Sequence, residues 1–213
     1  MQPIFTSTTV RVDRLVLGAY GTNTYVLTSL QTSESLVIDA PAEAKKILEL
    51  LQGTRPRAIL LTHGHLDHTG ALLPLKTALK VPVAAHREDS PRLPLKPDIF
   101  CTDGEKLALG AHEIEVFHTP GHTPGSLCFL VGGVLFAGDT LFPGGPGRTQ
   151  TPADFRLILE SLSRKIFPLP NETRVFPGHG EPTTLKAERP AFEAFRARHR
   201  DPRMCGDVLW ASS

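Results

Sequence analysis

The chain has 213 residues, of which 40% are hydrophobic and 21% are charged, and its formal net charge is +1. This size and composition are typical of one globular domain, and we predict a single domain over residues 1–213. The near-neutral charge argues against nucleic acid or an anionic membrane as a partner. The N-terminal MQPIFTSTTV lacks the basic and apolar regions of a signal peptide, and the cysteines at 101, 128 and 205 are widely spaced. We therefore expect free thiols and a cytoplasmic protein.

Short apolar runs between glycine, proline and asparagine positions predict strands in the first half of the chain. These predicted strands cover residues 10–17, 24–28, 36–39, 58–61 and 81–85. One helix is expected from Pro41, which suits the first helical position, to Gly53, and another from Gly70 to Leu79. Residues 86–104 contain three prolines without a clear period, which predicts a long surface loop that is either functional or a plain connector.

The second half begins with short strands between Leu107 and Phe136, including a hairpin at Gly132-Gly133. Thr151 is a predicted N-cap, because Pro152 follows it and the next apolar residues keep helical spacing. A short strand at residues 175–176 and a final helix over residues 185–199 complete the expected elements.

One pattern of elements occurs twice along the chain. A strand, Asp39, a helix and a strand lead to His63, and a strand, Asp139, a helix and a strand lead to His179. This repetition favours a duplicated unit, with two sheets packed face to face and the helices outside.

The segment LTHGHLDHTG at residues 61–70 places three histidines and one aspartate directly after an apolar run. In an extended chain, the rings of His63 and His65 point to the same side. Three further candidate ligands each follow a predicted strand and lie among glycines, which permit the sharp turns that hold a ligand rigidly. They are His122 in TPGHTPGS, Asp139 in FAGDTLF and His179 in FPGHGEP. Each residue alone is more often an ordinary loop residue, but their shared context favours a common site.

Imidazole and carboxylate ligands without a thiolate predict zinc, with iron or manganese as alternatives. Seven ligands are too many for one tetrahedral ion, so we predict two divalent ions. The predicted assignment is His63, His65 and His122 for the first ion, Asp67, His68 and His179 for the second ion, and Asp139 as the bridge. Two ions about 3.5–4 Å apart can share a water and lower its pKa toward about 7, which supplies a bridging hydroxide and predicts a hydrolase. Asp67 and Asp139 are also the predicted catalytic carboxylates.

The other four histidines lie outside this pattern, and we assign none of them to the site. They are His86, His112, His118 and His199. His118 precedes the TPGH turn and could support a ligand from behind, but a plain structural role is expected.

The motifs THGHLDH, TPGHTPGS, GDTLF and PGHG, in this order, resemble those of the metallo-β-lactamase superfamily. Their combination is most similar to glyoxalase II (hydroxyacylglutathione hydrolase) and its shorter bacterial relatives. The similarity runs from Asn23 to Thr184. It implies an α/β (α+β) fold of the αββα sandwich type, with two mixed sheets, helices on the outer faces and the metals at one edge. It also implies the ligand assignment given above and a small-molecule thioester or ester as substrate, in a monomer or homodimer.

Some positions depart from the glyoxalase II pattern. Arg148, nine residues after Asp139, fills the place of a basic substrate-binding residue, but Gln150 and Glu181 stand where the family usually has tyrosines. Glu181 would repel an anionic thioester near its reactive end. Only 34 residues follow His179, so we expect most of the C-terminal glutathione-binding region of the longer enzymes to be missing. Arg148 either holds a substrate carboxylate or stabilises its own loop, PGGPGR.

These observations favour a hydrolase that cleaves a thioester such as a hydroxyacyl-glutathione. Persulfide dioxygenases resemble the sequence too, but they use one iron held by the first three ligands and activate oxygen. A lactonase or another ester hydrolase with the same centre is a third candidate, and a metal-loaded binding protein without turnover is a fourth. Metal content and a panel of substrates separate these functions.

Overall fold

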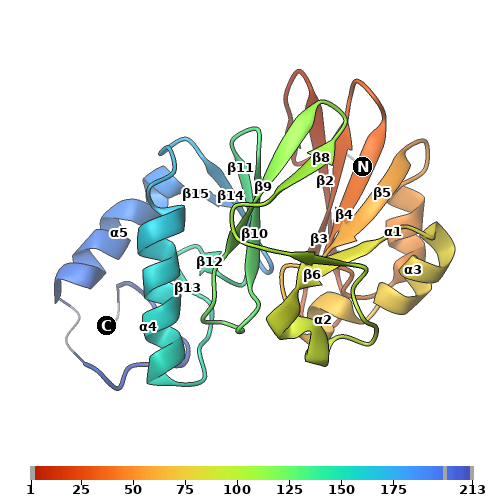
Figure 1. The fold of residues 1–213 in the computed structure, drawn as a ribbon. Helices are drawn as coiled ribbons and strands as arrows, with labels where there is room; N and C mark the ends of the chain where they lie inside the picture. The colour runs from red at the N-terminus through yellow and green to blue at the C-terminus, as the bar shows by residue number, and fades with distance from the viewer. Residues whose placement is uncertain (1–2, 199–200, 212–213) are drawn as a thin grey trace.

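The computed structural model describes residues 3–198 and 201–211, and it contains two large β-sheets packed face to face (Figure 1). The first sheet has seven strands, and its order follows the sequence. They are β1 (Phe5–Thr6), β2 (Val10–Leu17), β3 (Thr22–Ser29), β4 (Glu34–Ile38), β5 (Arg55–Leu60), β6 (Val83–His86) and β7 (Ile99–Cys101). The strands from β1 to β4 pair antiparallel, and those from β4 to β7 pair parallel. This sheet is therefore mixed.

The second sheet has six strands in the order β15-β14-β11-β10-β9-β8. They are β8 (Lys106–Leu109), β9 (His112–His118), β10 (Leu127–Val131), β11 (Val134–Gly138), β14 (Arg174–Pro177) and β15 (Thr183–Thr184). The pair β11 and β14 is parallel, and the other pairs are antiparallel. A small separate sheet joins β12 (Leu141–Phe142) and β13 (Gly145–Pro146). The second sheet is mixed as well.

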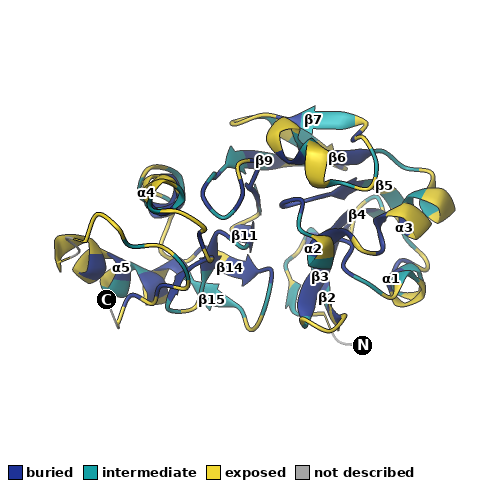
Figure 2. Cartoon of the chain, turned by 90° about the horizontal axis from the view of Figure 1, so that it is seen from below, coloured by how far each residue is buried: buried dark blue, intermediate teal, exposed yellow. Residues whose placement is uncertain are grey.

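Helices cover the outer face of each sheet (Figures 1 and 2). On the first sheet lie α1 (Ala44–Leu50) and α3 (Leu72–Leu79), and on the second lie α4 (Pro152–Ser161) and α5 (Leu185–Arg198). A π-helical turn, η2 (Leu162–Ile166), extends α4. The predicted αββα sandwich of two mixed sheets with outer helices is confirmed. Among the described residues, no helix combines the length and the apolar character that a bilayer span requires.

Successive side chains along each strand point to opposite faces of the sheet, and this divides the core into three layers. On β11, Phe136 packs between the sheets, while its neighbours Leu135 and Ala137 face α4 and α5. On β5, Leu60 faces the second sheet and Ile59 faces the helices α1 and α3. Each fully buried large apolar side chain contributes about 1.5–3 kcal/mol relative to exposure. Strands with two buried faces thus hold the loops at their ends in place.

Two local predictions are confirmed by the backbone. β10 and β11 form a hairpin in which Gly132 and Gly133 have φ angles of 54° and 78°, as a two-residue turn of this hand requires. Thr151 caps α4: its hydroxyl accepts from the Asp154 N–H at 3.2 Å, and the Asp154 carboxylate accepts from the Thr151 N–H. The helix α4 therefore begins at a well-defined residue, Pro152, and packs on the second sheet.

One predicted helix start and one predicted loop are wrong, and one predicted helix is present as α3 (Leu72–Leu79) with a small difference at its start. The first helix begins at Ala44 instead of Pro41, because the backbone of Ala40 instead bonds to His68 and Ala71. The helix predicted from Gly70 is preceded by a separate turn, α2 (Leu66–Thr69). The segment 86–104 is not a plain loop, since it contains the 3-10 helix η1 (Arg87–Arg92) and β7.

The final predicted helix is present as α5, and His199 lies outside the described residues. The segment after it returns to the second sheet. Trp210 is buried against Phe192 and Phe195, with ring centroids 5.3 and 5.1 Å apart. The backbone of Gly206 pairs with that of Thr149 in both directions, at 2.9 and 3.2 Å. The C-terminal segment is thereby attached beside the loop that carries Arg148.

Candidate metal centre

The seven candidate ligands meet at one edge of the sandwich, where strands of both sheets end. His63 and His65 follow β5, and Asp67 and His68 lie on the short helix α2. The remaining three come from the second sheet: His122 from the β9–β10 connection, Asp139 after β11 and His179 after β14. Both halves of the chain therefore contribute to the site.

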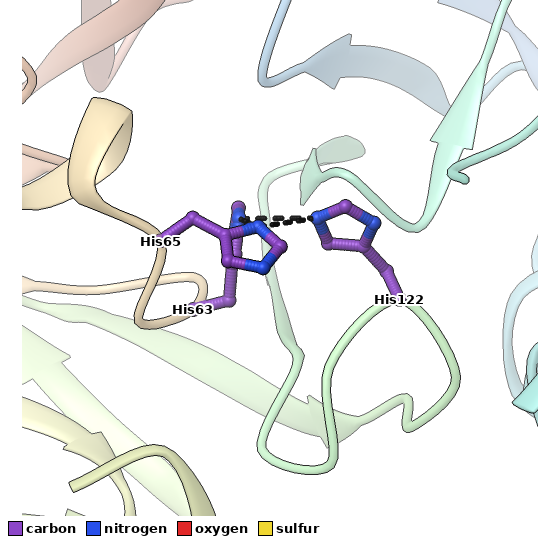
Figure 3. Close-up of side chains that lie close together, drawn as sticks. All are labelled: His63, His65 and His122. Carbon is purple, nitrogen blue, oxygen red and sulfur yellow. Dashed lines mark hydrogen bonds between the residues drawn. The ribbon is translucent and has the colours of Figure 1, made fainter. Parts of the chain in front are cut away.

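The first group consists of three imidazoles whose ring nitrogens converge (Figure 3). His65 Nδ1 lies 3.1 Å from His63 Nε2 and 2.9 Å from His122 Nε2. The two Nε2 atoms of His63 and His122 are 3.3 Å apart. The rings of His63 and His122 lie nearly perpendicular to that of His65, so three nitrogens face a common point.

The second group consists of Asp67, His68 and His179. His179 Nε2 is 3.2 Å from Asp67 Oδ2 and 3.3 Å from His68 Nε2. Asp67 Oδ2 and His68 Nε2 are 3.8 Å apart. His68 is fully buried, while His179 and Asp67 remain partly open to solvent.

Asp139 reaches both groups. Its Oδ2 lies 3.4 Å from His122 Nε2 in the first group and 3.6 Å from His179 Nε2 in the second. Its Oδ1 is 3.3 Å from His68 Nε2. Gly178 permits this approach, because a Cβ atom there would lie 2.1 Å from Asp139 Oδ1 and 2.7 Å from the His68 ring. A glycine before His179 is therefore a steric requirement of the site.

The ring nitrogens that point away from the centre are held by hydrogen bonds. His122 Nδ1–H donates to the Arg148 carbonyl at 2.8 Å, and His179 Nδ1–H donates to the Tyr20 carbonyl at 3.1 Å. His68 Nδ1–H donates to Asp39 Oδ2 at 2.8 Å. Because these acceptors need a proton on Nδ1, each neutral ring presents a bare Nε2 to the centre.

His63 is oriented through a relay. Thr62 Oγ1 donates its proton to Asp39 Oδ2 at 2.7 Å, so it can only accept from His63 Nδ1–H, 3.1 Å away. His63 Nε2 is therefore bare as well. In the sequence, Asp39 stands out only as part of the repeat, and no pattern marks Thr62. The repeat was the signal for Asp39, since it placed Asp39 at the position equivalent to Asp139.

The protonation equilibria of the ligands suit cation binding. Burial, and then the adjacent His68, hold the pKa of His63 well below its usual value, and burial also lowers the pKa of His65. Burial raises the pKa of Asp139, but the neighbouring His68 outweighs it and holds this pKa well below the usual range. Burial lowers the pKa of His68, but Asp39 and Asp139 reverse this and raise it to about 10. A cation that binds at His68 must therefore displace a proton.

These residues fit a divalent metal. Without a cation, bare nitrogen lone pairs of His63 and His122 face each other at 3.3 Å. Asp139 Oδ1 is buried without a well-formed hydrogen bond to the described residues, and the charge that faces it is His68 Nε2 at 3.3 Å. Buried polar atoms left in this state cost several kcal/mol, and a metal coordinated by nitrogen and oxygen removes that cost.

A cavity of about 600 Å³ opens beside the first group. It is lined by His65, His122, Arg148, Thr149, Gln150, Cys205 and Gly206. The Arg148 guanidinium is exposed, and its Nε lies 3.8 Å from Oδ2 of Asp207, which is exposed as well. Arg148 and Gln150 therefore share one cavity with two of the candidate ligands, which the sequence alone could not establish.

Glu181 differs from its expected role. Arg14 donates to both of its carboxylate oxygens, at 3.1 and 3.2 Å. Its charge is partly compensated, so the repulsion of an anionic substrate expected from the sequence is weakened. His118 has a structural contact: its Nε2–H donates to the Pro124 carbonyl at 2.8 Å, and its ring stacks on His86.

A model of the metallo-beta-lactamase superfamily matches residues 17–179, a range that includes all seven candidate ligands. The chain belongs to the metallo-beta-lactamase superfamily. Members of this metallo-hydrolase superfamily bind divalent metals, and this member has the His and Asp donor groups for them. The resemblance stated from the four motifs is confirmed.

Three individual proteins are similar to this chain in sequence or in structure. Hydroxyacylglutathione hydrolase GloC of Haemophilus influenzae is 35% identical over 176 residues, which cover 72% of this chain and 83% of GloC. The crystal structure of TTHA1623 in a di-iron-bound form is 38% identical, with a TM-score of 0.74, and covers 83% of this chain and 96% of its own. ETHE1 from Myxococcus xanthus is 26% identical, with a TM-score of 0.75, and covers 84% of this chain and 81% of its own.

Proposed function

We propose that this superfamily member is a cytoplasmic hydrolase that uses two divalent metal ions to cleave a thioester such as a hydroxyacyl-glutathione. The observation that carries the proposal is the pair of donor groups that share Asp139 at distances of 3.4 and 3.6 Å. The similarity to the hydroxyacylglutathione hydrolase GloC supports the thioester, and the di-iron form of TTHA1623 supports two ions. Zinc and iron, with manganese as a further alternative, suit these ligands.

The proposed ligands are His63, His65 and His122 for the first ion, Asp67, His68 and His179 for the second, and Asp139 for both. When bound, two such ions lower the pKa of a water molecule and polarise the carbonyl of the substrate. The reaction forms a C–O bond to the acyl carbon and breaks its C–S bond, so the products are a carboxylic acid and a thiol.

The residues of the chain have distinct tasks in this reaction. The hydrogen bonds to Asp39, Arg148 O and Tyr20 O keep the imidazole tautomers in the coordinating form. Asp67, which is partly exposed at the mouth of the site, is our proposed acceptor for the proton of the attacking water. Arg148 would bind a carboxylate of the substrate in the adjacent cavity.

A persulfide dioxygenase with one iron is the second candidate function. The structural similarity to ETHE1 fits it. A lactonase or another ester hydrolase with the same centre is a further variant of the first proposal.

The deciding experiment combines metal analysis with rates on three substrates. Purified protein is assayed with lactoyl-glutathione, a simple lactone and glutathione persulfide, before and after chelation. We expect about two metals per chain and hydrolysis of lactoyl-glutathione that chelation abolishes. One iron per chain with oxygen uptake on the persulfide would replace the proposal with the dioxygenase. Full activity after exhaustive chelation would refute both.

A further inference from the structure

Asp89 lies in the segment 86–104, for which the sequence predicts either a functional loop or a plain connector. It sits on η1 (Arg87–Arg92), which follows β6, and it is only 1% exposed. A buried carboxylate is costly unless several donors satisfy it. The donors that satisfy Asp89 come from two loops that each carry candidate metal ligands.

Three hydrogen bonds end on the Asp89 carboxylate. Oδ2 accepts from the Gly64 N–H at 2.7 Å and from the Thr123 hydroxyl at 2.8 Å. Oδ1 accepts from the Gly125 N–H at 2.9 Å, and Arg92 lies 3.5 Å away with partial exposure. Gly64 separates His63 from His65, and Thr123 follows His122. The carboxylate thus joins the two loops that present the first donor group.

Both loops approach the Asp89 segment too closely for any side chain. A Cβ atom on Gly125 would lie 2.7 Å from Asp89 N and 2.8 Å from Asp89 Cγ. A Cβ atom on Gly64 would lie 2.8 Å from Arg92 Cβ and 3.1 Å from the Asp89 carbonyl oxygen. The packing therefore reinforces the hydrogen bonds and leaves the loops little freedom.

The contacts of Asp89 are specific to one group. The hydrogen bonds that its carboxylate makes with described residues reach the loops of His63, His65 and His122. The second group depends on a different carboxylate, because Asp39 accepts from His68 Nδ1–H. Asp39 also reaches the first group, through Thr62 and His63, whereas the hydrogen bonds of the Asp89 carboxylate to described residues end on Gly64, Thr123 and Gly125.

We propose that Asp89 is a positioning residue that sets the affinity of the first metal position, formed by His63, His65 and His122, and not of the second. The inference rests on the metal centre of the proposed function, but it does not depend on which bond the enzyme cleaves. Asp89 acts through the backbone of Gly64 and Gly125 and through Thr123, and it does not contact the metal.

The test measures metal affinity in Asp89→Asn combined with loss of either position. In a His179→Ala background, which weakens the second position, the measured Zn²⁺ affinity is that of the first position. In a His122→Ala background the reverse holds. Zn²⁺ affinity is measured by chelator competition, and Co²⁺ absorption reports the ligand geometry. We expect Asp89→Asn to weaken Zn²⁺ by about 10–100-fold in the first background and by less than about twofold in the second.

Two further variants separate positioning from general stability. Thr123→Val keeps the shape but removes one donor to Asp89, and we expect about tenfold weaker Zn²⁺ in the His179→Ala background. Asp13→Asn changes another buried aspartate, on β2, whose partner is Arg11, and should leave both metal affinities unchanged. If Asp89→Asn does not fold, Thr123→Val carries the test.

Equal losses in both backgrounds, or no loss in either, would overturn the proposal. A lower melting temperature of Asp89→Asn with unchanged Zn²⁺ affinity would also overturn it, since Asp89 would then be merely structural. Because no substrate is used, a failure of thioester hydrolysis in the wild-type protein leaves these outcomes readable.

Discussion

Asp39 and Asp139 occupy equivalent places in the two halves of the chain, yet they face opposite sides of one imidazole. Each follows a strand that pairs in parallel with the strand leading to the ligand histidine: β4 with β5, and β11 with β14. Asp39 Oδ2 lies 2.8 Å from His68 Nδ1, and Asp139 Oδ1 lies 3.3 Å from His68 Nε2. In our proposal, one half supplies the support for a ligand histidine, and the other supplies a ligand.

The backbone accounts for this difference. In the first half the left-handed residue is Asp39 itself, with φ of 61°, while in the second half it is Gly138, one residue earlier, with φ of 47°. Asp39 is then satisfied by the Thr62 N–H, the Thr62 hydroxyl and His68. Asp139 Oδ1 is buried without a well-formed hydrogen bond to the described residues. A strand-end aspartate therefore acts as ligand or support according to how many local donors its carboxylate already has.

The comparison is tested most severely by Asp139→Ala. We expect at most one metal per chain and a loss of about a thousandfold in kcat/KM, because this carboxylate reaches both donor groups. Elemental analysis and steady-state rates on a thioester measure the two effects. A variant that keeps two metals per chain would show that the bridging assignment is wrong.

Gly178→Ala tests whether the site needs the backbone of Gly178 to lie this close to Asp139 and His68. The new Cβ would displace Asp139 or His68, and a shift of about 1 Å at a catalytic centre can cost about a hundredfold in rate. Gly180→Ala is the matched control, since its Cβ would meet nothing within 4 Å although its φ is +71°. We expect the control to lose about 1 kcal/mol of stability and to keep its metals. Similar rate losses in both variants would contradict this account.

Asp39→Asn tests the support role in the first half. Asparagine tolerates the left-handed conformation but removes the charge that faces His68 and Thr62. We expect metal affinity to fall by about 10–100-fold, measured by competition with a chelator. Unchanged affinity would mean that hydrogen-bond geometry alone, without the charge, orients the imidazole.

Arg148→Ala gives the smallest expected effect and concerns a feature of the second half only. The residue nine positions after Asp139 is Arg148, whereas nine positions after Asp39 is Leu48 on α1. We expect KM to rise about tenfold for an acidic thioester and much less for a neutral ester, because only the acidic substrate has a charge that Arg148 can bind. The effect on the acidic substrate is modest because solvent screens an exposed ion pair. Arg164→Ala, at a similarly exposed arginine on the same half, is the control. An equal rise on both substrates would assign Arg148 to its loop.

The sequence predicted the αββα architecture and the seven residues that the structure brings together. His63 and His65 follow one strand, Asp67 and His68 follow in the same motif, and the other three each come after a strand and lie among glycines. Strand ends at one edge of a sandwich meet in space. The assignment of ligands to individual ions remains a prediction. The repeat also matches two parallel strand pairs in the structure.

Other features had no readable pattern. Asp89 binds backbone N–H groups 25 and 36 residues away, and any residue other than proline supplies such a donor. The start of the first helix depends on the bonds of Ala40 to His68 and Ala71, which are tertiary. The pairing of Glu181 with Arg14 spans 167 residues, so Glu181 read as an unpaired charge. Long-range polar contacts of this kind require the fold.

The two sheets contribute different members of the same donor groups, and this has a consequence for heat resistance. A cation held by His63 and His65 from one sheet and His122 from the other ties the two layers together at their open edge. A ligand that binds only the folded state raises the free energy of unfolding by about 2.7 kcal/mol when its free concentration is a hundred times its Kd. The melting temperature of this protein should therefore follow the metal supply of its surroundings, and the metal-free protein should be cleaved faster by a protease than the metal-loaded protein.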